Sequence, residues 1–229
     1  MNSELFDKIN TILPTLYYEN NNTYDLNYLN KVLFTSMELL KNLSNKEKII
    51  LLNTELTFQE CTDIIGTSVL LHKIFDKKYV IKQINITDRK DFLNYYLNGI
   101  IDNTHLNIIF NIVDNISFIN EIKGLVNNLG KYEILKMIVS DSVKLESMGS
   151  DAIDKMIIYN HFNKKDDHSR NIIRHCKQKL FKLKDYIHTS YAKDVAKTFE
   201  KQLKLIVSDE IFLSNHINTR IQLLNLNNT

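Results

Sequence analysis

The sequence predicts an α/β fold, in which a three-layer, mostly parallel sheet with crossover helices precedes a C-terminal helical region. Two observations lead to this fold class. Between residues 46 and 162, short apolar runs rich in β-branched residues alternate with amphipathic helical patterns, which is typical of parallel strands joined by helices. After residue 162, apolar residues recur only at helical spacing. With 229 residues, the chain is long enough for one domain with a helical extension.

Residues 1–45 are expected to form helices that pack on the sheet domain. Apolar residues at helical spacing predict helices over residues 2–13 and 26–43. Pro14 and the polar run 19–22 interrupt this pattern, so we expect a surface loop between the two helices.

The predicted sheet domain comprises residues 46–162. Strands are expected at five apolar runs, which are 48–53, 79–86, 106–114, 134–139 and 155–159. Crossover helices are expected at 59–75, 89–101 and 116–129. The run 106–114 is apolar on both faces, as a central strand should be. Periodicity alone does not separate such short runs from buried helix segments, so an all-helical fold stays open as an alternative.

Residues 163–229 are expected to form a basic helical region, with helices over 167–187, 190–206 and 210–225. Between Asn163 and Lys204, twelve basic residues face only five acidic ones, whereas the whole chain has a net charge of +2. Near-helical spacing would let part of this set follow a phosphate backbone, although a solvated helix face explains the charges equally well. The predicted binding residues for nucleic acid or an acidic partner are Lys164, Lys165, Arg170, Arg174, Lys177 and Lys184.

Composition and spacing exclude several kinds of site. The five glycines never come closer than six residues, so an ordinary glycine-rich phosphate loop is excluded. The histidines His161, His168 and His175 are two helical turns apart, too far to share one ion, and Cys61 and Cys176 form no C-x-x-C pair. We therefore expect neither a metal nor a cofactor.

The sequence also indicates where the protein is located. The N-terminus lacks a signal-peptide pattern, and no apolar run approaches the roughly 18 residues that a membrane span requires. An intracellular protein, cytoplasmic or nuclear and without membrane contact, is expected.

The predicted order of elements resembles the core of the AAA+ nucleotide-binding fold of origin-recognition and clamp-loader subunits, over about residues 30–210. The segment 55–62 has the length of a Walker A phosphate loop and ends in threonine. It departs from that motif because Glu55, Glu60 and Cys61 occupy the positions of the glycines and the lysine. From the residues alone, this is a strand-to-helix loop whose acids favour the start of the next helix.

Two further segments resemble motifs of this family. The run 109–115 resembles the Walker B strand, but Asn115 stands where the family has the glutamate that activates water. From the residues alone, Asp114 in this run is expected to cap the N-terminus of a helix. The run 137–142 resembles the sensor strand, with Ser140 or Asp141 at its polar position.

The resemblance implies a nucleotide-binding fold that has lost hydrolysis. The first hypothesis is therefore a non-catalytic, pseudo-ATPase-like subunit or adaptor of a multiprotein assembly, with protein subunits as partners and nucleic acid as a further partner. No catalytic residue is expected in it. One alternative is a transferase on an α/β fold, with its site at the strand ends near Asp114 and Asp141. The other alternative is an all-helical protein-interaction module.

Overall fold

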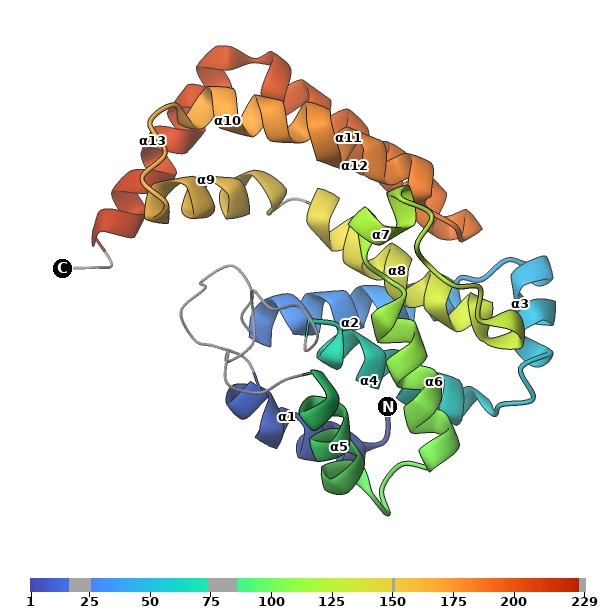
Figure 1. The fold of residues 1–229 in the computed structure, drawn as a ribbon. Helices are drawn as coiled ribbons and strands as arrows, with labels where there is room; N and C mark the ends of the chain where they lie inside the picture. The colour runs from blue at the N-terminus through green and yellow to red at the C-terminus, as the bar shows by residue number, and fades with distance from the viewer. Residues whose placement is uncertain (17–25, 74–85, 150, 227–229) are drawn as a thin grey trace. The chain divides into compact units, whose positions relative to one another are not determined.

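The structure of the protein, a computed structural model, describes residues 1–16, 26–73, 86–149 and 151–226. In these residues it contains helices and no strand (Figure 1). The predicted three-layer α/β fold is therefore wrong, and so is the resemblance to the AAA+ fold, because both require a sheet. The chain divides into two compact units, Met1–Ser142 (unit 1) and Val143–Thr229 (unit 2).

Unit 1 is built around one apolar helix, α4 (Phe58–Leu71), which contacts α1, α2 and α6. Most of its side chains are buried, and a side chain at Gly66 would lie 2.9 Å from Sδ of Met1 and 3.3 Å from Leu33. The glycine therefore lets the neighbouring segments approach α4 closely. The other elements of unit 1 are α1 (Ser3–Leu16), α2 (Leu26–Lys41), α3 (Asn45–Leu52), α5 (Ile86–Leu97), α6 (Asn103–Asp114), α7 (Phe118–Ile122), the 3-10 turn η1 (Gly130–Tyr132) and the first part of α8 (Glu133–Met148).

Four of the five expected strands belong to helices. The runs at 48–53, 106–114, 134–139 and 155–159 fall in or at the end of α3, α6, α8 and α9 (Ala152–Phe162), respectively. The expected strand 79–86 lies outside the described residues, apart from Ile86, which begins α5. In α6 the exposed polar residues Asn107, Asn111 and Asp114 lie on one side of the helix, and the buried apolar residues occupy the rest of its circumference. The run therefore has helical spacing, and its richness in β-branched residues led to the strand prediction.

Most of the expected helices are confirmed. Those at 2–13, 26–43, 59–75, 89–101, 190–206 and 210–225 correspond to α1, α2, α4, α5, α12 (Ser190–Ser208) and α13 (Glu210–Leu226) within the described residues. The expected helix 116–129 is reduced to the five residues of α7. It ends where Gly124 adopts a positive φ of 66°, a conformation that suits glycine and not a continuing helix.

Unit 2 comprises the end of α8, α9, α12, α13 and a long helical segment over residues 168–186, which we call the basic run. The basic run corresponds to the expected helix 167–187 and consists of α10 (His168–His175), the π-helical turn η2 (Cys176–Leu180), α11 (Phe181–Leu183) and the 3-10 turn η3 (Lys184–Tyr186). It buries Ile172, Cys176, Leu180 and Leu183. Helix α13 packs against α9, α10 and α12, and α12 contacts η3.

Within the described residues, none of the helices combines the length and the apolarity that crossing a bilayer requires.

Candidate functional site

The segment that resembled a phosphate loop is a helix start. Thr57 is the N-cap of α4, and its hydroxyl accepts a hydrogen bond from the backbone N–H of Glu60 at 3.2 Å. In return, the Glu60 carboxylate accepts from the backbone N–H of Thr57 at 2.7 Å and from its hydroxyl at 2.8 Å. These hydrogen bonds hold the pKa of Glu60 below its usual value. The expectation that this acid favours the start of the next helix is confirmed.

Glu55 and Asp114 form ion pairs within unit 1. Glu55 has a φ of 64°, and its exposed carboxylate lies 2.5 Å from the Lys131 ammonium. Asp114 lies 2.8 Å from Lys90 and is the last residue of α6. The expectation that Asp114 caps a helix N-terminus is therefore wrong.

The residues expected at the ends of strands do not gather at a sheet edge, because the sheet is absent from the described residues. Asn115 caps the end of α6: its side-chain amide donates to the carbonyl of Asn111 at 2.8 Å, and its Oδ1 accepts from the backbone of Asn127 at 2.6 Å. Ser140 and Asp141 are buried in the middle of α8.

A buried polar centre lies instead at the end of α4. We define it by Ser68 and His72 of α4 and Tyr28 of α2. All three side chains are buried, and the rings of Tyr28 and His72 lie 6.0 Å apart between centroids. His72 Nδ1 donates to the carbonyl of Val69 at 2.6 Å, which leaves its Nε2 as an unprotonated acceptor. Neither Nε2 of His72 nor Oγ of Ser68 has a hydrogen-bond partner in the part of the chain that the structure describes.

The environment of His72 keeps its imidazole neutral. Burial, and secondarily the charge of the adjacent Lys73, lowers the pKa of His72 to about 3. A neutral imidazole can accept a hydrogen bond or bind a metal ion, but a metal site needs several protein ligands around the ion. Among the described residues, no group of three or more His, Cys, Asp or Glu side chains could hold a metal ion.

The two cysteines are free and buried. Burial raises the pKa of the Cys61 thiol and raises that of Cys176 to about 11. Both side chains therefore stay protonated at neutral pH, which does not suit a nucleophile.

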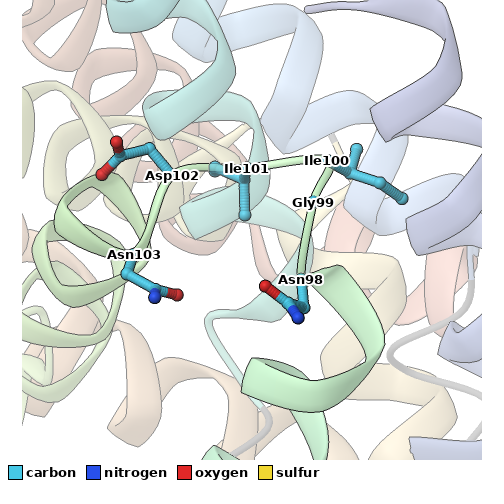
Figure 2. Close-up of a pocket in the computed structure, with 6 residues that line it drawn as sticks. All are labelled: Asn98, Gly99, Ile100, Ile101, Asp102 and Asn103. Atoms are coloured by element: carbon cyan, nitrogen blue, oxygen red, sulfur yellow. The ribbon is translucent and has the colours of Figure 1, made fainter.

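A shallow hollow of about 290 Å³ lies at the loop between α5 and α6 (Figure 2). One stretch of chain, residues 98–103, lines all of it, and Gly99 turns this stretch with a φ of 79°. Figure 2 shows the amide side chains of Asn98 and Asn103 turned toward one another, whereas Asp102 points away. The Asp102 carboxylate caps α6 by accepting from the backbone N–H of Thr104. The hollow is thus a surface feature beside a helix cap, lined by one stretch of chain.

Five of the six predicted binding residues have exposed side chains in unit 2. They lie on the basic run and on the turn before it, on a different side from the buried Ile172 and Leu180. None of the five forms an ion pair with a described carboxylate, and Arg174 donates only to the neutral amide of Asn171, at 2.6 Å. The five residues are Lys164, Lys165, Arg170, Arg174 and Lys177.

The sixth residue, Lys184, has an internal role. Its ammonium lies 2.8 Å from the carboxylate of Glu200 on α12, which Lys204 also approaches at 2.9 Å. Lys204 lies in turn 5.7 Å above the ring of Phe181. Burial raises the pKa of Glu200, but the hydrogen bonds and charges of the two lysines outweigh this effect and hold the pKa below its usual value.

Sequence reasoning did not find this ion-pair cluster or the buried polar centre. Residues 184 and 200 lie on different helices, so no spacing along the chain relates them. The i, i+4 spacing of Glu200 and Lys204 was a signal for their pairing within one helix.

No protein-family model matches the chain, and no curated protein matches it significantly. Several solved structures do share its fold. A crystal structure from Lactobacillus plantarum covers 91% of this chain and 95% of its own length, with a TM-score of 0.64 and 17% identity. Bacillus subtilis YpgQ in complex with ADP covers 87% and 93%, with a TM-score of 0.61 and 18% identity. An HD-superfamily hydrolase from Bacillus thuringiensis covers 92% and 98%, with a TM-score of 0.57 and 14% identity.

At this level of identity the likeness establishes the fold alone, and the chain shares the all-helical fold of these solved structures. It overturns the hypothesis of a pseudo-ATPase-like subunit, because that hypothesis depended on the AAA+ resemblance. A transferase on an α/β fold is excluded because that fold requires a sheet, and the described residues form none. The alternative of an all-helical interaction module agrees with the fold.

Proposed function

We propose that this chain is an all-helical interaction module, and that the exposed basic side chains of unit 2 bind an anionic macromolecule. One observation carries the proposal. Lys164, Lys165, Arg170, Arg174 and Lys177 are all exposed, and none of them is neutralised by a described carboxylate. Their charges are therefore available to a partner.

Hydrolysis like that of the Bacillus thuringiensis neighbour finds less support in the residues of this chain. A metal-assisted hydrolase needs several protein ligands around one ion. The buried polar centre contains one neutral imidazole, and the next residue along the chain is the cation Lys73 and not a carboxylate. Its donor set does not fit a metal ion.

The proposal is tested by retention on immobilised heparin and by the sodium chloride concentration that elutes the protein. The change is Arg170→Glu combined with Lys177→Glu, which places two negative charges in the basic run. We expect this variant to elute at a clearly lower salt concentration, because electrostatic binding weakens with every cation removed.

A matched control separates this site from the charge of the whole chain. Lys46 and Lys48 on α3 are exposed side chains of unit 1, so Lys46→Glu with Lys48→Glu changes the net charge equally. We expect the control to elute close to the unaltered protein. Equal losses in the two variants would contradict a binding site on the basic run.

A further inference from the structure

We infer that the anionic partner is a nucleic-acid duplex, bound through its phosphodiester backbone and without regard to base sequence. This inference rests on the proposed function, because it names the partner of the same basic surface. Three observations support it. They are the spacing of the cations along the basic run, the further cations on α12, and the absence of exposed large apolar side chains from the basic run.

The cations of the basic run follow its length. Arg170, Arg174 and Lys177 succeed one another at intervals of four and three residues, which places them on one side of a helix. Arg170 and Lys177 are seven positions apart, which corresponds to about 10 Å along the helix axis. A duplex presents roughly six phosphate charges over that length, so all three side chains can find a phosphate.

Helix α12 carries further cations in unit 2. Lys193 and Lys201 are exposed and have no carboxylate partner among the described residues, whereas Lys197 is paired with Asp194 at 2.9 Å. The contacts of Glu200 with Lys184 and of Lys204 with Phe181 tie α12 to the end of the basic run. The carboxylate of Glu200 is only 11% exposed, so it hardly repels an approaching anion.

The basic run lacks the features of two other kinds of interface. Large apolar side chains are absent from its exposed residues, although protein–protein interfaces depend on buried aromatic and apolar anchors. It also offers no free aromatic platform for single-stranded bases, because Phe181 is partly buried under Lys204 and Tyr186 is partly buried. Within the basic run, exposed cations without apolar anchors match protein–DNA interfaces, which are more polar and more positively charged, whereas the exposed side chains of Phe162, Tyr191 and Leu205 lie outside the run.

Fluorescence anisotropy with labelled short duplexes of DNA and of RNA tests the inference in the full chain. We expect binding at low salt, equal for unrelated base sequences. The plot of log K against log salt concentration should have a slope of about −3 to −5, since each phosphate contact contributes about −0.9 on B-DNA. A preference between the two duplexes would identify which nucleic acid supplies the backbone.

Single substitutions make the test specific to the basic run. Arg170→Ala and Lys177→Ala should each weaken duplex binding and make the slope shallower by about one unit, whereas Lys46→Ala on α3 should change neither. Circular dichroism of each variant checks that it is folded. Duplex binding that is indifferent to salt, or equal losses in all three variants, would overturn the inference.

A polyglutamate arm distinguishes the inference from the proposed function. Binding of polyglutamate without binding of any duplex would overturn the inference in favour of an acidic protein, and the proposed function would stand. Absence of binding to both kinds of polyanion at low salt would overturn the two together.

Discussion

His72 is buried, and its acceptor atom has no hydrogen-bond partner among the described residues. A buried polar atom without a hydrogen bond costs about 1–3 kcal/mol relative to one that is paired. The Nε2 atom of His72 and the Oγ atom of Ser68 both carry this cost in the part of unit 1 that the structure describes. The buried apolar side chains of α4, among them Ile64, Ile65 and Val69, offset this cost.

The low pKa of His72 predicts that the protein loses stability in mild acid. The unfolded chain binds a proton at this histidine below about pH 6.5, whereas the folded chain does so only near pH 3. The free energy of unfolding should therefore fall by about 1.4 kcal/mol per pH unit through this group as the pH decreases between those values. Urea unfolding at several pH values measures the effect.

A His72→Gln variant provides the comparison, because glutamine does not titrate and can still donate to Val69. The difference in unfolding free energy between the unaltered protein and the variant should shift in favour of the variant as the pH falls below 6.5. Parallel pH profiles for the two proteins would contradict the assignment.

Helix starts show how short-range sequence signals act at the level of elements. Helices α3 and α4 both begin with a capping box, formed by Ser44 with Glu47 and by Thr57 with Glu60. Helix α7 begins with Ser117, whose side chain makes no capping hydrogen bond. A serine or threonine at the N-cap thus makes a capping hydrogen bond in α3 and α4 but not in α7.

Removal of the Thr57 hydroxyl should destabilise the protein. We expect Thr57→Ala to lower the free energy of unfolding by about 1 kcal/mol, because the N–H of Glu60 loses its acceptor. Ser117→Ala is the matched control and should change the free energy by less than about 0.5 kcal/mol. Urea unfolding of both variants at neutral pH provides the measurement, and equal losses would argue against the capping box.

One carboxylate of α12, that of Glu200, forms an ion pair with the basic run. We expect Glu200→Gln to lower the free energy of unfolding by about 1 kcal/mol, because two lysines lose their partner. Asp194→Asn is the control, since its pair with Lys197 is exposed on both sides and should contribute little.

The stabilisation that the Glu200 carboxylate provides depends on pH. The folded-state pKa of Glu200 is lowered, so its stabilisation is present above the unfolded value near 4.5 and is lost as the pH falls through the folded value. Thermal unfolding at pH 7 should therefore separate Glu200→Gln from the unaltered protein more than unfolding at pH 3. A larger separation in acid would contradict this role of Glu200.

At the scale of the whole molecule, the main error in the predicted fold concerns the apolar runs. The sequence predicts them as strands of a sheet, whereas the described ones form helices. The run 106–114 was expected to be a strand between two layers of helices. In the structure it is α6, which contacts α4 and α5 and buries its apolar side, whereas Asn107, Asn111 and Asp114 are exposed. The polar residues follow helical spacing, but the β-branched composition of the run favoured a strand, and the composition was given too much weight.

The all-helical fold predicts a far-UV circular dichroism spectrum dominated by helix, with no component from a sheet. Deconvolution should give a helix content that agrees with the element bounds in unit 1 and unit 2 together. A spectrum with a substantial sheet component would contradict the fold and restore the α/β alternative.

The sequence alone determined the features that depend on neighbours within a few residues. These include the amphipathic helices α1, α2, α12 and α13, the helix over the basic run, the capping acid Glu60 and the excess of basic residues after Asn163. Helical spacing and charge density act locally, so they are legible in the chain itself.

The tertiary structure decided what depends on residues that are far apart in the chain. It placed the described apolar runs in helices, paired Lys184 with Glu200 and left Lys177 without a carboxylate partner among the described residues, although the two lysines have the same chemistry in the sequence. It also enclosed His72 beside Tyr28, 44 residues earlier in the chain. Burial and ion pairing are properties of packed neighbours, and sequence spacing does not specify which segments become neighbours.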